Sequence, residues 1–373
     1  MPRPALHITR SLITLLACLL AIACQAESPQ RSSLPAIEDG QDFFVVLQYH
    51  HVDDTTPAPT SVRVEQFEQH LAYLDEHDFN VLALDEALDS LQQGRGLPDR
   101  SIVISFDDSY DSIYREAFPR LQARGFAFTV FVNTDVIDEG RRGMLSWDQL
   151  RQMRASGGLI ANHSISHPHF PRRRDQMGDD WHDWARQQIS HVEQRLIDEL
   201  GETPKLFAWP YGEYDSDSLA LLDEMDLIGF GQHSGVVGRY EDWRALPRFA
   251  VNVQHADLDS LALKMHAKPL PVTSAQPDET KLEAEDRQPV LELTLSDNAP
   301  SGGWKASINC FVGGQGRTEV QWLDEQQLSL QASRPLPAGR ARYNCTARDD
   351  DGRFFWYSRQ WLLPREDGSW PPE

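Results

Sequence analysis

The 373-residue chain is short of basic residues. It has 35 Lys and Arg against 57 Asp and Glu, which gives a formal net charge of −22. Phosphate-rich nucleic acid and anionic membrane surfaces would repel such a chain, so we expect neither as a partner. Global disorder is also excluded, because 40% hydrophobic and 9% aromatic residues suffice for a sizeable core. An acidic surface could attract a cationic polymer, or it could simply keep the protein soluble.

The apolar stretch near the start of the chain, residues 12–23, is too short for a comfortable membrane span. Arg3 and Arg10 precede it, and small residues follow it. A basic start, a short apolar core and small residues are typical of a secretory signal peptide, which we place at residues 1–26. A polar, Pro-containing tether follows over residues 27–41.

The signal segment contains Ala21-Ile22-Ala23-Cys24, which resembles a lipobox. We therefore expect Cys24 to be acylated; simple cleavage after Ala23 or Ala26 is the alternative. Gln25 stands where an Asp would often retain a lipoprotein at the inner membrane. The expected location is the periplasmic face of the outer membrane, with the lipid as the sole membrane attachment. Without the lipid, the protein would be periplasmic or secreted.

Continuous apolar runs at residues 43–47, 102–104 and 126–132 indicate strands that are buried on both faces. Helical patterns lie between and after them, and Ser146-Trp147-Asp148-Gln149 is typical of a capping box that begins a helix. Strands that alternate with helices predict an α/β domain, here over residues 42–265. Functional side chains are expected at the C-terminal ends of such strands.

Residues 266–289 are rich in Pro and polar residues and are predicted to be a linker. Residues 290–366 are predicted to be a separate C-terminal domain, in which residues 291–295 and parts of 304–312 and 318–323 alternate between apolar and polar, as strands do. Cys310 and Cys345 are the pair left in an exported chain, which implies a disulfide that would contribute roughly 3–4 kcal/mol in the chain-entropy model. With Trp322 between them, they follow the order typical of an immunoglobulin-like β-sandwich.

Two motifs carry the chemistry. Ser105-Phe106-Asp107-Asp108 directly follows one of the apolar runs, and His163-Ser164-Ile165-Ser166-His167 comes about 55 residues later. One Asp and two His form a facial set of metal ligands, and the second Asp is then free to act as a base on a metal-activated water. The i, i+4 spacing aims both imidazoles at one point if the segment turns helically. Two surface histidines in a polar loop are the alternative.

Together the two motifs resemble those of the polysaccharide deacetylases of carbohydrate esterase family four, the NodB-homology domain. The resemblance implies a distorted (β/α) barrel and hydrolysis of an acetamide carbon–nitrogen bond. It also implies Asp107 as the catalytic base, with Asp108, His163 and His167 on one divalent metal ion. Zinc is the expected ion, and cobalt, nickel or iron would fit the same ligands.

The third motif of this family is Arg-x-Pro-Tyr/Phe-Gly, and this chain has Ala208-Trp209-Pro210-Tyr211-Gly212. By resemblance, the Tyr211 N–H would help to hold the oxyanion, and Trp209 and Tyr211 could line a sugar ring. The Arg that orients the catalytic Asp in the family is missing, and Arg244 and Arg248 are its candidate replacements. The predicted substrate-binding residues are Trp209, Pro210, Tyr211 and Gly212.

Tyr49-His50-His51-Val52 is similar to the Tyr-His-x-Val signature of the PgaB and IcaB type, deacetylases of poly-β-1,6-N-acetylglucosamine. These also have the third motif Trp-Pro-Tyr-Gly-Glu, which is matched here through Glu213. The resemblance therefore implies metal-dependent N-deacetylation of this polysaccharide, with release of acetate. We expect His50 to interact with the departing amine; His233 and His255 are the alternatives.

Other functions share these motifs. Chitin oligomers, peptidoglycan and acetylxylan are alternative substrates, and a non-catalytic glycan-binding or polysaccharide-assembly protein would keep the fold. The missing Arg is the feature that keeps this last hypothesis open. The expected partners are the polysaccharide and an exopolysaccharide export machinery of the kind used in biofilms. The C-terminal domain could bind carbohydrate, dock a partner or act as a spacer.

Overall fold

The computed structural model describes residues 40–297 and 303–372, together with Met1. The predicted signal peptide, Cys24 and most of the predicted tether lie outside the described residues. Within the described ranges, we find no helix that is both long enough and apolar enough to cross a membrane.

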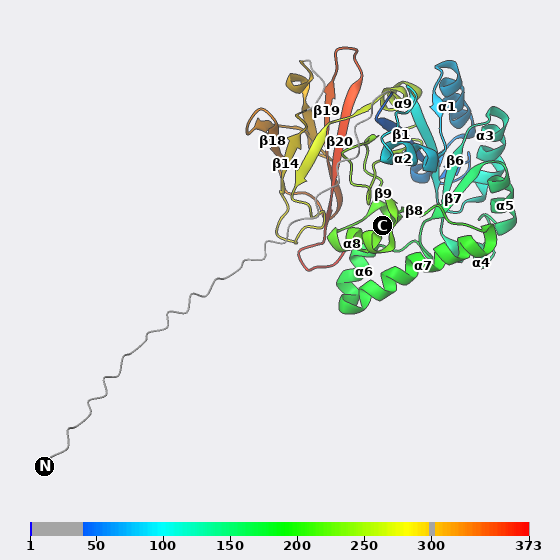
Figure 1. Ribbon diagram of the computed structural model, residues 1–373, viewed down its shortest axis with the longest axis horizontal. Helices are drawn as coiled ribbons and strands as arrows, with labels where there is room; N and C mark the ends of the chain where they lie inside the picture. Colours follow the sequence, from blue (N-terminus) through cyan, green and yellow to red (C-terminus); the bar gives the residue numbers. More distant parts are fainter. Residues whose placement is uncertain (2–39, 298–302, 373) are drawn as a thin grey trace. The chain divides into compact units, whose positions relative to one another are not determined.

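A mixed sheet forms the centre of the first domain (Figure 1). Its strands are β1 (Phe43–Tyr49), β4 (Asn80–Val81), β5 (Ser101–Asp107), β6 (Phe128–Val132), β7 (Gly158–Asn162), β8 (Leu206–Ala208), β9 (Ile228–Phe230), β10 (Val237–Gly238) and β11 (Phe249–Ala250). The order is β10-β1-β5-β6-β7-β8-β9, with β11 beside β1 and β4 beside β5. From β1 to β9 all neighbours are parallel, so their C-terminal ends meet at one edge.

Helices lie on both sides of this sheet. They are α1 (Val64–Glu76), α2 (Leu84–Gln92), α3 (Phe118–Arg124), α4 (Thr134–Asp138), α5 (Trp147–Ala155), α6 (Phe170–Met177), α7 (Trp181–Leu200), α8 (Ser216–Met225) and α9 (Leu258–Met265). The predicted capping box is confirmed: Ser146 accepts from the Gln149 N–H, and the Gln149 side chain accepts from the Ser146 N–H. Short strands β2 (His51–Val52) and β3 (Ser61–Val62) pair separately.

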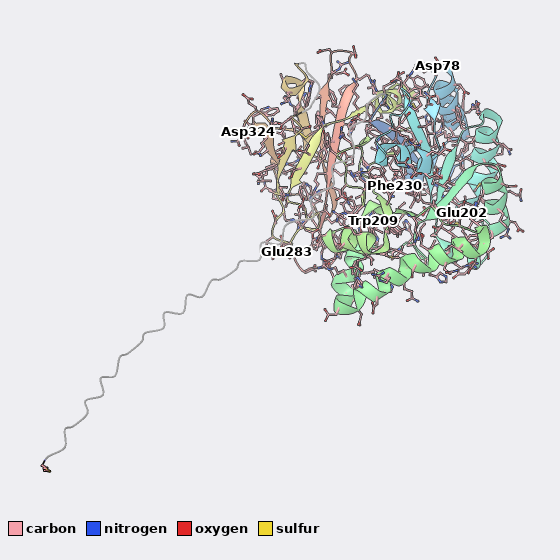
Figure 2. All side chains as sticks on the ribbon, viewed as in Figure 1. Asp78, Glu202, Trp209, Phe230, Glu283 and Asp324 are labelled. Atoms are coloured by element: carbon pink, nitrogen blue, oxygen red, sulfur yellow. A yellow bond between two sulfur atoms is a disulfide. The ribbon has the colours of Figure 1, made fainter. Side chains whose placement is uncertain are left out.

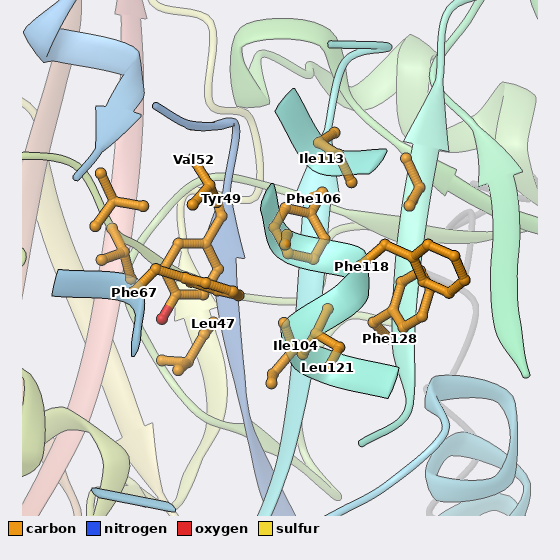
Figure 3. Close-up of a cluster of buried hydrophobic side chains, with 14 of the residues drawn as sticks. Leu47, Tyr49, Val52, Phe67, Ile104, Phe106, Ile113, Phe118, Leu121 and Phe128 are labelled. Carbon is orange, nitrogen blue, oxygen red and sulfur yellow. The ribbon is translucent and has the colours of Figure 1, made fainter. Parts of the chain in front are cut away.

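The two faces of the sheet pack into separate apolar cores, which explains the continuous apolar runs. Val45 and Leu47 of β1 join the core that contains residues of α1 and α3, whereas Phe44 and Val46 join the core that contains residues of α2. Figure 3 shows Leu47 of β1 and Ile104 of β5 within the first of these cores. Strands buried on both faces, as predicted, are therefore confirmed.

The predicted distorted barrel is present as a curled sheet. One irregular segment, residues 243–250, connects the β9 side of this sheet with the β1 side. Near its start, Leu246 exchanges backbone hydrogen bonds with Gly229 and Gly231 at β9. At its end, β11 pairs in parallel with β1. This segment therefore brings its side chains close to the C-terminal ends of β1 and β5.

The rest of the described chain forms two further sheets that share one apolar core. Their strands are β12 (Lys268–Pro269), β13 (Val272–Gln276), β14 (Val290–Leu295), β15 (Asn309–Val312), β16 (Gly316–Thr318), β17 (Val320–Trp322), β18 (Gln327–Gln331), β19 (Gly339–Arg348) and β20 (Phe354–Leu363). One sheet has the order β12-β20-β19-β15-β16, and the other has the order β13-β14-β18-β17. We call this part the C-terminal β domain.

Two expectations about this domain need correction. The predicted linker, residues 266–289, contains β12 and β13, and the side chains of Val272 and Ala275 lie in the shared core. These strands are short and flanked by proline, so the sequence shows no sustained apolar alternation there.

The immunoglobulin-like features also differ in the structure. The predicted Cys310–Cys345 disulfide is present, but it joins directly opposite residues on neighbouring strands of one sheet. In an immunoglobulin domain the disulfide joins the two sheets, with a Trp packed against it. Trp322 instead lies on strand β17 at the edge of the other sheet, and it is 39% exposed.

Candidate active site

The two adjacent carboxylates diverge where β5 ends. Asp107 is the last residue of the strand, and its side chain is fully buried. Asp108 has a φ of 68°, a left-handed conformation that Asp tolerates better than most residues. The chain therefore turns between them, and the Asp108 side chain faces the edge of the sheet with 14% of its area exposed.

Asp107 is held by a buried cation. Arg248 donates from Nη1 to Oδ1 at 2.6 Å and from Nη2 to Oδ2 at 2.7 Å, and Gln48 donates to Oδ2 at 2.5 Å. Arg248 is itself fully buried and donates from Nε to the Gly231 carbonyl at 2.9 Å. Burial alone would raise the pKa of Asp107, but Arg248, followed by His163, holds that pKa well below its ordinary value.

Of the two arginines named from the sequence as replacements for the one absent at Ala208, Arg248 is the one that bonds Asp107. Arg244 points elsewhere: it donates from Nε to Asp242 at 2.9 Å and from Nη1 to Asp223 at 2.8 Å. The difference comes from the closing segment, because Arg248 precedes β11, which pairs with β1 beside β5.

Asp108, His163 and His167 come together as a possible metal site. One ligand atom from each lies within 4.8 Å of the others. His163 donates from Nδ1 to the Ala208 carbonyl at 2.7 Å, which leaves its Nε2 as the acceptor nitrogen. That Nε2 is buried without a hydrogen-bond partner and lies 3.7 Å from Asp108 Oδ1. A buried imidazole nitrogen with no hydrogen-bond partner, beside a carboxylate and a second imidazole, fits a divalent ion such as zinc.

The two histidines are brought together by a loop and not by the helical turn that the spacing suggested. Ser164 and His167 both have positive φ, 69° and 53°. The loop is fixed by hydrogen bonds from the Ser164 N–H to the Asn162 side chain at 2.8 Å and from the His167 N–H to the Ser164 hydroxyl at 3.1 Å. Burial lowers the pKa of His167 to about 4, so its ring is neutral near pH 7, as a ligand must be.

His50 lies near this site, at the end of β1. Tyr49 pairs with Phe106, so His50 follows β1 where Asp107 ends β5. It contributes to lowering the pKa values of both Asp107 and His167, in each case behind larger causes. The alternatives lie elsewhere. His255 is exposed on the loop before α9, and His233 is buried with its ring against Tyr214.

Tyr110 is a site residue that the sequence reasoning missed. Its hydroxyl forms a hydrogen bond with Asp108, and burial followed by this carboxylate raises the pKa of Tyr110 well above its ordinary value. The hydroxyl therefore stays protonated and donates to Asp108. Its position two residues after the paired carboxylates was the available signal.

Some residues of the third motif lie in the core, and others lie at the site. Trp209 is fully buried, packs edge-on against Phe207 and donates from Nε1 to the Arg244 carbonyl at 2.8 Å. Its backbone N–H donates to the carbonyl of Phe230, and Figure 2 labels both residues. The predicted sugar-stacking role of Trp209 is therefore wrong, because its ring is part of the core. Pro210 is buried as well.

Tyr211 stays at the site. It is half-buried, with a φ of 59°. Its ring packs edge-on to His167 at a centroid distance of 4.3 Å and stacks on His169 at 3.7 Å. Gly212 follows with a φ of 68°, and a Cβ there would lie 2.6 Å from the Gln232 backbone nitrogen. Only glycine fits this close approach.

Glu213 follows this turn and fixes the residue that stacks on Tyr211. Its carboxylate is fully buried and accepts from Arg172 Nη2 at 2.5 Å and from His169 Nδ1 at 2.7 Å. Burial would raise its pKa, but the hydrogen bonds from His169 and Arg172 bring that pKa below its ordinary value. The residue that stacks on Tyr211 is thus itself fixed by Glu213.

This combination of groups agrees with the comparisons to known proteins. Residues 94–229 match the family described as polysaccharide deacetylase. This match covers less than half of the chain. Members of that family are hydrolases that act on carbon–nitrogen bonds, and the family depends on a metal ion.

The chain is also similar to named proteins. It is 23% identical over 261 residues to the poly-β-1,6-N-acetyl-D-glucosamine N-deacetylase of Escherichia coli K12, covering 59% of this chain and 38% of that protein. It is 26% identical over 198 residues to the enzyme of the same name from Staphylococcus aureus MSSA476, covering 52% and 68%. The chain thus spans well under half the length of the Escherichia coli relative.

A solved structure shows the same fold. The structure of IcaB from Ammonifex degensii aligns with a TM-score of 0.53 and 25% identity, over 61% of this chain and 98% of that one. The curled α/β sheet of the first domain therefore has the NodB-type fold that the sequence resemblance implied.

Proposed function

We propose that the protein is a metal-dependent N-deacetylase of an N-acetylhexosamine polysaccharide, with poly-β-1,6-N-acetylglucosamine as its substrate. The observation that carries this proposal is the buried Asp107–Arg248 pair directly beside the Asp108, His163 and His167 cluster. A buried ionised base next to a cation site is what metal-assisted hydrolysis of an amide requires. The names of the relatives and the Trp-Pro-Tyr-Gly-Glu match through Glu213 support the choice of polymer.

The residues of the chain divide the reaction between them. A divalent ion on Asp108, His163 and His167, zinc in our proposal, would supply a Lewis acid and acidify a bound water. Asp107 accepts the proton of the attacking water; because Arg248 and Gln48 keep this carboxylate ionised, it is ready to do so but is only a weak base. It therefore depends on the acidification of the water to act.

Two further groups complete the proposed mechanism. The Tyr211 N–H donates to the oxygen of the acetamide as it becomes an oxyanion. His50, at the end of β1 near Asp107, assists the protonation of the departing amine. The products are acetate and a glucosamine residue, which is cationic near neutral pH and would be attracted to a chain of net charge −22.

The hypothesis of a non-catalytic glycan-binding protein depended on the missing arginine. The guanidinium of Arg248 bonds both oxygens of Asp107, so the absence of an arginine at Ala208 no longer argues against catalysis. Chitin oligomers, peptidoglycan and acetylxylan stay as alternative substrates.

We also propose where the enzyme acts. Its first residues support export with a lipid on Cys24, and hence a position on the periplasmic face of the outer membrane. There it would modify the polymer alongside an exopolysaccharide export machinery, as in biofilm formation. Labelling with a fatty-acid probe in wild type and in Cys24→Ala tests the lipid: label that persists in the variant contradicts it.

Acetate release tests the function directly. Purified protein loaded with zinc is incubated with poly-β-1,6-N-acetylglucosamine, chitin oligomers and acetylxylan in parallel, with and without a chelator. We expect acetate from the first polymer, its loss on chelation and its recovery when metal is returned. Equal or greater release from chitin oligomers or acetylxylan would overturn the choice of polymer. No release from any substrate would overturn the proposed activity.

A further inference from the structure

One face of the C-terminal β domain packs on the deacetylase domain. Along β19 and β20, residues alternate between the core of the β domain and the opposite face. Tyr343 and Trp361 lie in that core. On the other face, Ser358 forms a hydrogen bond with Ser234 at 2.8 Å, and Trp356 donates from Nε1 to the same hydroxyl at 3.0 Å.

Two residues of this face form hydrogen bonds with the turn of the third motif, at Tyr211 and Gly212. Arg340 of β19 donates from Nη1 to the Tyr211 carbonyl at 2.8 Å. Gln360 of β20 donates from Nε2 to the Gly212 carbonyl at 2.7 Å, and it is only 2% exposed. Two consecutive carbonyls of one turn in the deacetylase domain are therefore bonded to neighbouring strands of the other domain.

The turn needs such support. Tyr211 and Gly212 both have a left-handed backbone conformation, which is unfavourable for a tyrosine and persists where surrounding contacts impose it. The guanidinium of Arg340 also lies over the Tyr211 ring at 5.8 Å and 3.7 Å from Glu213 Oε1. Arg340 thus contacts the carbonyl, the ring and the anchoring carboxylate of the same turn.

The end of the chain adds a third contact on the same side. The Pro371 carbonyl accepts from Arg172, the partner of Glu213, at 3.3 Å. The ring of Trp370 lies 5.1 Å from the Arg172 guanidinium and donates from Nε1 to Asp175 of α6 at 3.0 Å. The anchor of the turn is therefore covered from the C-terminal β domain as well.

We propose that the C-terminal β domain positions the active site: Arg340 and Gln360 hold the Tyr211–Gly212 turn, and so keep the Tyr211 ring against His167 and its N–H toward the reacting acetamide. The inference rests on the proposed function for its catalytic consequence, but the holding of the turn is independent of it. Arg340 and Gln360 are positioning residues, since neither contacts the ligand cluster itself.

The test compares Arg340→Met with Gln360→Leu, alone and combined, in the full chain. Arg353→Met is the matched control, because Arg353 also donates from the β domain to a backbone carbonyl of the first domain, that of His266 at 2.8 Å, away from the turn. We expect the double variant to lose about 10- to 100-fold in kcat with KM changed by less than about threefold, because the oxyanion donor is displaced while binding groups remain. The control should stay within about twofold, and Arg340→Lys should recover part of the loss.

A second readout does not depend on activity. Hydrogen exchange of a peptide spanning residues 206–215 should accelerate in the double variant and not in the control, while zinc affinity stays within about threefold. Unchanged exchange and unchanged kcat in a folded double variant would overturn the inference, and so would an equal effect in the control. If the wild type releases no acetate, the proposed function fails, and the exchange result alone decides whether the β domain holds the turn.

Discussion

The two sides of the active site are built in different ways, although they meet at adjacent residues. The ligand side consists of Asp108, His163 and His167, which come from two short motifs at the ends of β5 and β7. The other side, which we call the base side after the role proposed for Asp107, consists of Asp107 and its partners Arg248 and Gln48, which come from three separate segments of the chain. One side is local in sequence, and the other exists only in the fold.

This difference separates the roles of two identical side chains. The charge of Asp107 is already compensated by a bidentate arginine, so it gains little from a cation. Asp108 faces two imidazoles and a tyrosine hydroxyl, with no such cation on its carboxylate among the described contacts. The position of Arg248 thus decides which Asp is left for a metal ion.

Exchange of the two acids for amides should produce the largest effects and separate these roles. Asp107→Asn should lower kcat by about 10³-fold, because the proton acceptor is lost, while one zinc per chain is retained. Asp108→Asn should lose both activity and stoichiometric zinc. The measurements are acetate release and metal content after gel filtration. Full activity of Asp107→Asn would contradict its role as proton acceptor, and full zinc content of Asp108→Asn would contradict its role as metal ligand.

The turn beside the ligands predicts the next largest effect, on stability. Glu213→Gln removes the charge that compensates buried Arg172 and should lower the free energy of unfolding by about 3–5 kcal/mol at pH 7. Because the folded-state pKa of Glu213 is lowered, its contribution is present above its ordinary pKa of 4.5 and is lost as pH falls below that value. The gap between wild type and variant should therefore narrow below about pH 4.5.

Denaturant unfolding at several pH values measures that gap. Asp217→Asn is the control, since Asp217 pairs with Arg174 at the surface with 47% of its side chain exposed. Its effect should stay within about 1 kcal/mol at every pH. A gap for Glu213→Gln that is constant from pH 7 to pH 3.5 would contradict the assigned ion pair.

The local side of the site could be predicted from the sequence because its signal is contiguous. Asp107 and Asp108 follow an apolar run, and parallel strands bring such ends to one edge. Spacing alone did not give the geometry, however. His163 and His167 converge through a loop with two left-handed residues, a conformation that no periodicity reveals.

The other side could not be predicted, because its contacts span long distances in sequence. In the sequence, Arg248 and Arg244 are equal candidates, and only the pairing of β11 with β1 beside β5 separates them. Trp209 was placed in the sugar site because aromatic residues serve both cores and glycans, and only its full burial separates the two. The strands in the predicted linker are hidden in the sequence because both are short and lie beside prolines, and because β12 pairs with the distant strand β20.

The smallest expected effect tests how far the base side depends on arginine geometry. Arg248→Lys keeps the positive charge but cannot donate to both oxygens of Asp107 while bonding Gly231. We expect kcat to fall by about 10-fold with zinc content unchanged, because the carboxylate stays ionised but loses its fixed orientation. Arg244→Lys is the control: Arg244 pairs with Asp242 and Asp223 away from the base, so its kcat should stay within about twofold. If the kcat of Arg248→Lys also stays within about twofold of wild type, the positive charge beside Asp107 suffices and the paired hydrogen bonds do not matter. The contrast between the two sides of the site would then not extend to arginine geometry.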